Sequence, residues 1–338
     1  MAVGTVKARV HGARRLLNER VMAMSRNWHG ECEWPEAERP TMPLEGLAKA
    51  TLAYYGLGSF EGLGSVYEPH GSLGVGVRAG SGRYRLWRCR RFMTAELVAL
   101  QHAMLERLGA RGVPAKRLVR ARDAATWQEV DGQLVSLYEW FSGPAPDLTS
   151  RREVAEVATL HARWTLAMAE FDPPIPGWRE VAARWRPRKP WAWVLPTEEL
   201  PLVPQRMRFF AAVRDVEDPP SHHERMLGQV RDTEARLARF ATAASEFGLA
   251  RLPRAMNHGV FLLGCVDWEP MVTDADDFQY EARIGDLGRL LFAIHDWRLP
   301  HHRMRDQVAL AVDTYCAQVD LSPEELRALP LYSWAQLL

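Results

Sequence analysis

Acidic side chains gather late in the chain, where they could bind a metal ion. Asp267 directly follows the apolar run 261–266, which has the pattern of a short buried strand. A carboxylate at the end of such a strand suits Mg²⁺, which binds proteins through one or two carboxylates together with phosphate oxygens. A second acidic run, 274–277, follows. Runs of this kind are most often solvated loops, and contact with metal or substrate is the alternative.

The cysteines and histidines do not predict a further metal site. The four cysteines are scattered without a C-x-x-C pair: Cys32, Cys89, Cys265 and Cys316. The histidine pairs at 222–223 and 301–302 have no second histidine at helical spacing, so a solvated surface explains them better than zinc. We therefore expect no disulfide framework and a reducing, cytoplasmic location.

Composition narrows the class of protein. The chain has 338 residues with 43 basic and 42 acidic side chains, a net charge of +1. This balance argues against a dedicated nucleic-acid binder, and no apolar run approaches the roughly 18 residues of a membrane span. Only four of the basic residues are lysines, namely Lys7, Lys49, Lys116 and Lys189. Codon bias explains the arginine excess more simply than phosphate binding does.

The elements that must position the acidic residues fall into two groups. The first half favours strands at 65–67, 73–78, 84–89, 118–120 and 134–141, with one helix at 95–108 that Thr94 would cap. The second half favours helices from 150 onwards, at about 221–247, 283–297 and 303–318, with capping boxes that begin at Ser150 and Ser322. Residues 173–204 are expected to form a long irregular connection. The pattern predicts an α+β chain with a small antiparallel β-rich lobe at 42–143 and a larger helical lobe at 144–338. Residues 1–41 are expected to be a poorly ordered extension.

Seven short stretches occur in an order that is typical of one family. They are Tyr54-Tyr55-Gly56-Leu57, Tyr84 to Arg88, Glu96 through Pro114, Leu137 to Gly143, Ala158 to His161, Val266 to Glu269, and Asp286-Leu287. Over roughly residues 44–335 the chain resembles the aminoglycoside phosphotransferase and choline kinase-like family, which has a two-lobed protein-kinase-like fold and includes kinase-like proteins of spore coats. The resemblance implies phosphoryl transfer from ATP with Mg²⁺.

The resemblance also implies roles for individual residues. Arg88 would be the third-strand cation that holds the ATP phosphates, and Glu96 the helix carboxylate that holds this cation. The turn at 70–76, which contains Gly71 and Gly74, would cover the phosphates, although its spacing is not G-x-G-x-x-G. Asp286 would be a structural aspartate that steadies the catalytic loop.

The catalytic loop departs from the family motif His-Gly-Asp-x-His-x-x-Asn. With Asp267 and Asn257 as the metal ligands, the base position falls on Leu252. In an alternative register, 258–260 reads His-Gly-Val, and about nine residues are then missing before Asp267. In both registers the aspartate that would accept the substrate proton is absent, and loss of a general base forfeits roughly 10²–10⁴-fold in rate.

Two functional hypotheses follow. The first is a degenerate, pseudokinase-like protein that acts through binding or assembly, with a spore coat as one setting and a protein assembly partner. The second is an active ATP- and Mg²⁺-dependent phosphotransferase on a small-molecule hydroxyl or amine. ATP and Mg²⁺ are the expected cofactors if nucleotide binding is retained, and none otherwise. A nucleic-acid or membrane-surface role for the basic N-terminus is a minor third option.

Overall fold

The computed structural model describes most of the chain after residue 41. The described residues are 42–67, 73–80, 82–89, 93–140, 146–185, 251–258, 278–295 and 299–335, with single helical residues at 235, 239, 242, 243 and 246. The chain divides into the units Met1–Leu44 and Glu45–Leu338. All of the architecture below belongs to the second unit, apart from Leu44 at the start of its first helix.

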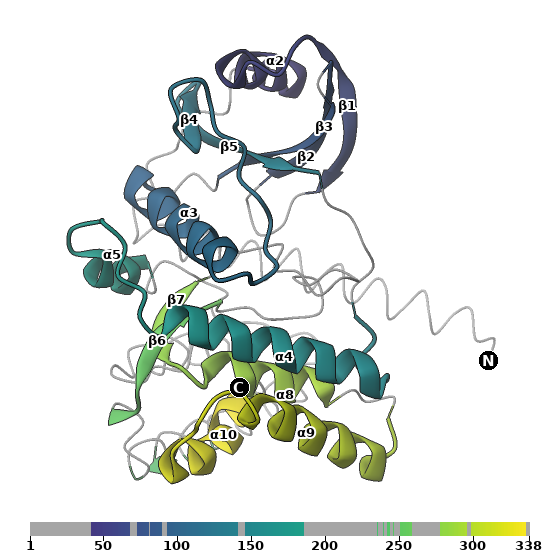
Figure 1. Cartoon of the computed structure of the whole chain (residues 1–338), viewed down its shortest axis with the longest axis vertical. Coiled ribbons are helices and arrows are strands. Elements are labelled where there is room, and N and C mark those ends of the chain that lie inside the picture. The colour runs from purple at the N-terminus through teal and green to yellow at the C-terminus, as the bar shows by residue number, and fades with distance from the viewer. Residues whose placement is uncertain are drawn as a thin grey trace, which may run out of the picture. The chain divides into compact units, whose positions relative to one another are not determined.

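A five-stranded antiparallel sheet forms the first lobe (Figure 1). Its strands, in the spatial order β1-β2-β3-β5-β4, are β1 Phe60–Tyr67, β2 Leu73–Ala79, β3 Gly82–Arg88, β5 Gln133–Glu139 and β4 Trp127–Val130. Helix α2, Leu44–Tyr55, lies beside one face of this sheet, and α3, Ala95–Ala110, lies between the sheet and the second lobe. Thr94 caps α3 by accepting a hydrogen bond from the backbone N–H of Leu97 at 3.3 Å.

Helices and a small sheet form the second lobe. The helices are α4 Arg151–Met168, α5 Trp178–Trp185, α8 Gly285–Ile294, α9 His301–Cys316 and α10 Pro323–Ala335, and strands β6 Arg254–Asn257 and β7 Gln279–Ala282 pair antiparallel. Helix α4 packs against α8, α9 and β6. Among the described residues, no helix is both long and apolar enough to cross a membrane.

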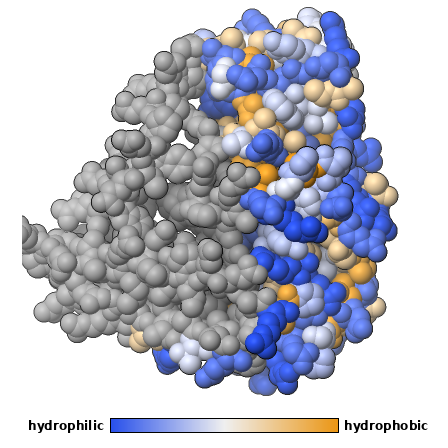
Figure 2. Space-filling model, turned by 90° about the vertical axis from the view of Figure 1, so that its left-hand side faces the viewer, coloured by the Kyte–Doolittle hydropathy of each residue, from blue (hydrophilic) through white to orange (hydrophobic). Residues whose placement is uncertain are grey.

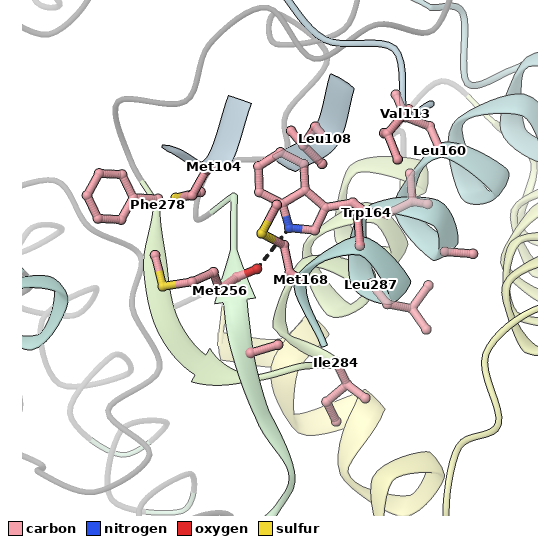
Figure 3. Close-up of a cluster of buried hydrophobic side chains, with 14 of the residues drawn as sticks. Met104, Leu108, Val113, Leu160, Trp164, Met168, Met256, Phe278, Ile284 and Leu287 are labelled. Carbon is pink, nitrogen blue, oxygen red and sulfur yellow. Dashed lines mark hydrogen bonds between the residues drawn. The ribbon is translucent and has the colours of Figure 1, made fainter. Parts of the chain in front are cut away.

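Trp164 of α4 lies at the centre of the core that joins these elements (Figure 3). Its ring lies among Met104 and Leu108 of α3, and its indole Nε1–H donates to the carbonyl oxygen of Met256 on β6 at 2.9 Å. The side chain is buried, so this hydrogen bond satisfies a polar atom that would otherwise be costly to bury. The strand that leads into the predicted catalytic loop is thereby fixed to α4.

The two-lobed α+β architecture agrees with the sequence prediction. Four local features of the structure differ from it. Residues 118–120 do not form a strand; Leu118 makes only an isolated bridge with Tyr138. Strand β4 and helix α5 were not predicted, the latter because prolines surround it.

The capping box at Ser322 is confirmed, since its N–H donates to Glu325 and its hydroxyl accepts from the Glu325 N–H. At α4, Ser150 caps the Glu153 N–H, but the Glu153 carboxylate accepts from Asp147 instead.

Three further predictions lie wholly or mostly outside the described residues. They are the extension at 1–41, the short strand at 261–267 and the helix at 221–247, of which only the five single residues named above are described, all helical.

Candidate active site

The two faces of the sheet separate Arg88 from helix α3. Side chains alternate along a strand, so Trp87 and Arg88 point to opposite faces of β3. Trp87 is paired with Ser136 of β5, whose hydroxyl is 3.1 Å from Nε2 of His102 on α3. Trp87 therefore shares the face that α3 covers, and Arg88 lies on the other face. Arg85, two residues before Trp87, is the β3 cation nearest to it on the α3 face.

Glu96 does not meet Arg88 either. Glu96 is exposed in the first turn of α3, where a carboxylate complements the helix dipole. The polar side chains that α3 buries are Gln101 and His102. The structure therefore does not bring Arg88 and Glu96 together, and sequence reasoning missed this because β3 buries the consecutive residues Leu86 and Trp87, which hides its alternation.

A different cation is buried beside the α3 face. Lys116 is 3% exposed, and its Nζ lies 4.9 Å from the ring centre of Trp87 and 4.3 Å from that of Tyr138. Both distances are typical of cation–π contacts. Burial, and secondly the positive charge of Lys116, lower the pKa of His102 to about 3, so this histidine is neutral near pH 7.

Aromatic stacking occupies the glycine-bearing part of the same face. Gly74 is paired with Tyr67 and Trp87 in the sheet, whereas Gly71 lies outside the described residues. A Cβ added to Gly76 would lie 2.9 Å from the ring of Trp140. The guanidinium carbons of Arg83 and Arg85 lie 4.3 and 4.9 Å from the centre of the same ring. Trp140 thus covers the part of the sheet, at β1 and β2, beneath which a bound nucleotide would lie.

Asn257 uses its side chain to hold backbone. It is 1% exposed at the end of β6, and its Nδ2 donates to the carbonyl oxygens of Ala255 and Ala282, at 3.3 and 3.0 Å. Its Oδ1 accepts from the backbone N–H of Asp286 at 3.4 Å. In this structure the Asn257 side chain therefore holds backbone, and its role as a Mg²⁺ ligand, which the resemblance implied, stays a prediction. The other predicted ligand, Asp267, lies outside the described residues.

Asp286 connects the start of α8 to the residue that follows β6. Its Oδ2 accepts from the backbone N–H of His258 at 2.5 Å, and its Oδ1 accepts from Nη1 of Arg289 at 3.0 Å. Nη2 of Arg289 also meets Oε1 of Glu281 at 2.6 Å, and all three charged groups are buried. This is the role expected of Asp286, and the long-range contact with Glu281 could not be read from the sequence.

Leu252 lies at the other end of strand β6. It precedes Arg254, the first residue of that strand, and it packs in the hydrophobic core with 6% exposure. His258 follows the last residue of the strand. The ring of His258 lies edge-on to that of Trp164, with centroids 5.4 Å apart. Burial is the main reason that the pKa of His161 lies well below its usual value, and electrostatic interactions with His258 and Arg289 lower this pKa further.

The described residues of the site therefore mainly hold the backbone and the core in place. Within the described ranges, no three His, Cys, Asp or Glu side chains converge in a way that could hold a metal ion. Asp267 and the acidic run 274–277 lie outside those ranges.

Comparison with known proteins identifies the fold. No family model matches the chain, and no curated protein matches it in sequence. Among solved structures, amicoumacin kinase in complex with AMP-PNP and Ca²⁺ is 12% identical with a TM-score of 0.60, over 87% of this chain and 84% of that one. A microcompartment-associated aminopropanol kinase is 15% identical with a TM-score of 0.59, over 86% of each chain. An aminoglycoside phosphotransferase from Alicyclobacillus acidocaldarius is 15% identical with a TM-score of 0.55, over 87% of this chain and 84% of that one.

The chain accordingly has the two-lobed kinase-like fold of aminoglycoside phosphotransferases and small-molecule kinases. A fold of this kind hosts more than one function, so the activity has to be argued from the site.

Proposed function

We propose that this protein is a pseudokinase-like member of the small-molecule kinase fold, which acts by binding or assembly and not by efficient phosphoryl transfer. The observation that carries this proposal is the hydrogen bond from the His258 N–H to Asp286. The resemblance implies that Asp286 steadies the catalytic loop, so this contact supports His258, directly after β6, as the first residue of that loop. The alternative register, in which 258–260 reads His-Gly-Val, is thus the one that the geometry supports.

In this register the loop lacks two reacting groups. The kinase motif H-R-D-x-x-x-x-N places its base two residues after the histidine and its metal-binding asparagine five residues after the base. Counting from His258, these positions are Val260 and Cys265, both outside the described residues. A valine cannot accept a proton, and a thiol is a poor ligand for Mg²⁺, which prefers oxygen.

The same register changes the candidate carboxylates. Gln279 opens strand β7 opposite Asn257, which closes β6, so the chain before β7 and the chain after β6 leave the small sheet at the same end. The acidic run 274–277 directly precedes this point, whereas Asp267 is twelve residues before Gln279. We propose Asp274, Asp276 or Asp277 as the carboxylate that would meet a phosphate-bound cation, in preference to Asp267.

The decisive experiment restores the base. Wild-type protein, Val260→Asp and the near-isosteric control Val260→Asn are assayed for phosphate transfer from ATP to amino alcohols and aminoglycosides. We expect almost no turnover by the wild type, and a rate for Val260→Asp that exceeds that of Val260→Asn by about 10²-fold or more. Robust turnover by the wild type would instead support the active phosphotransferase.

Ligand binding is tested separately by thermal unfolding with ATP, in the presence and absence of Mg²⁺. If nucleotide binding is retained, Mg²⁺-dependent stabilisation should be lost in at least one of Asp274→Asn, Asp276→Asn and Asp277→Asn, and kept in Asp267→Asn. No shift at millimolar ATP would contradict nucleotide binding. The spore-coat setting, the protein assembly partner and the cytoplasmic location stay predictions from the sequence.

A further inference from the structure

A cavity of about 1060 Å³ lies between the two lobes, outside the predicted active site. Its described lining comes from the last two turns of α3, from residues 112–120 and from α4, which neighbour one another in the fold (Figure 1). Among the described residues, neither strand β6 nor His258 contributes to the lining. The size is that of a pocket for a small organic molecule.

The floor of the cavity is apolar. It is formed by the side chains of Leu105, Val113, Leu118 and Leu160, three of which are buried. A ligand with an aromatic or alkyl body would remove this surface from water. By contrast, the face of the molecule seen in Figure 2 is mostly hydrophilic where it is described, with hydrophobic residues in small separate areas.

The rim of the cavity is cationic. Among the described residues, five basic and two acidic side chains line the cavity, a net charge of +3. Lys116 is buried, and the others are at least partly exposed at the rim: Arg117, Arg120, Arg152, Arg163, Glu106 and Glu156. Arg120 pairs with Glu106, and Arg163 donates to the carbonyl oxygen of Gly112. Arg117 meets Glu139 only at 3.9 Å and is 80% exposed, so most of its hydrogen-bonding capacity faces solvent.

Buried Lys116 supports an anion site independently of the basic rim. Although it is 97% buried, its Nζ has no hydrogen-bond acceptor among the described residues. An unsatisfied buried ammonium is costly, and its aromatic contacts with Trp87 and Tyr138 offset only part of that cost. Because Lys116 also lines the cavity, an anion held there would place a negative charge near this ammonium.

We propose that this cavity binds a small amphipathic anion, an aromatic or alkyl phosphate or carboxylate whose body lies on the apolar floor and whose charge meets the basic rim. Such a ligand contacts the first lobe through α3 and residues 112–120 and the second lobe through α4. It therefore fastens the two lobes together on binding and stabilises the folded chain by mass action.

The test uses the full chain and phenyl phosphate as the probe, with inorganic phosphate and benzyl alcohol as probes that have only the charge or only the ring. Calorimetric titration should show that phenyl phosphate binds more tightly than either. Lys116→Met, which keeps the stem and removes the charge, should weaken binding about tenfold, as expected for one lost charge-assisted interaction. Thr159→Trp, which fills the cavity from α4, should abolish binding.

A matched pair of arginines controls for general electrostatics. Arg151 and Arg152 are both exposed in the first turn of α4, but only Arg152 lines the cavity. Arg152→Gln should weaken binding about threefold, and Arg151→Gln should leave it unchanged. The proposal is overturned if phenyl phosphate does not bind at millimolar concentration, if Thr159→Trp binds it normally, or if the two arginine variants behave alike. Displacement by ATP would assign the probe to the nucleotide cleft and would also overturn the proposal.

Discussion

Substitution of Asp286 by asparagine should destabilise the whole chain, because this carboxylate lies between two buried hydrogen-bond donors. Asp286 is 2% exposed and accepts from the His258 N–H at 2.5 Å and from Arg289 at 3.0 Å. Breaking a buried ion pair by removing one partner costs about 3–5 kcal/mol. Arg289 keeps its 2.6 Å contact with Glu281, and asparagine keeps one acceptor oxygen, so we expect the lower end, about 3 kcal/mol.

Two measurements check this expectation. Urea unfolding of Asp286→Asn gives the loss of stability, with Glu324→Gln as a control, because Glu324 and its partner Arg327 are exposed and their pairing should not matter measurably. Amide hydrogen exchange should show faster exchange at His258 in the variant. A loss below about 1 kcal/mol with unchanged protection at His258 would refute the view that Asp286 holds the catalytic loop.

Two other consequences follow from buried side chains and close packing. Because the pKa of His102 is about 3 in the folded chain and about 6.5 when unfolded, the unfolded state takes up the proton first, and stability should fall as the pH drops from 6.5 towards 3. The loss by about pH 5 is roughly 2 kcal/mol and should be absent in His102→Gln, measured by urea unfolding at both pH values. Gly288→Ala should destabilise by about 1–3 kcal/mol, since the new Cβ would lie within clashing distance of the Tyr332 side chain where α8 meets α10; an unchanged unfolding midpoint would contradict that packing.

Local patterns were enough to predict the lobes, because strand alternation, helix caps and glycine turns act over a few residues. The Ser322 capping box and the Thr94 cap illustrate this, since each involves residues three positions apart. The register of the catalytic loop was not accessible from the sequence, because each alignment had its own defect. The first keeps the spacing to Asp267 but places Leu252 at the base position, whereas the second matches His-Gly at 258–259 but leaves about nine residues missing before Asp267. The contact between His258 and Asp286, 28 residues apart, is the observation that favours the second alignment.

The predicted contact between Arg88 and Glu96 was not found, for a different reason. Arginine outnumbers lysine so heavily in this chain that an arginine near the expected position carries little information. Burial of both Leu86 and Trp87 also removes the polar–apolar alternation that would have shown which face Arg88 occupies. The face of the sheet that Arg88 occupies follows from two contacts in the structure. Strand β3 pairs with β5, and Ser136 of β5 contacts His102.

Trp140 provides the last prediction, because it occupies the face on which a nucleotide would lie. Its ring is within 4.9 Å of the guanidinium carbons of both Arg83 and Arg85 and abuts Gly76. A phosphate group could reach Arg85 only after this stacking, worth about 0.5–2 kcal/mol for each contact, is given up. Trp140→Ala should therefore strengthen ATP binding several-fold, measured by the thermal shift at fixed ATP, whereas Trp140→Phe should retain the stacking and the weak binding. If Trp140→Ala bound ATP more weakly than the wild type, the ring would be part of the nucleotide site and not an obstacle to it.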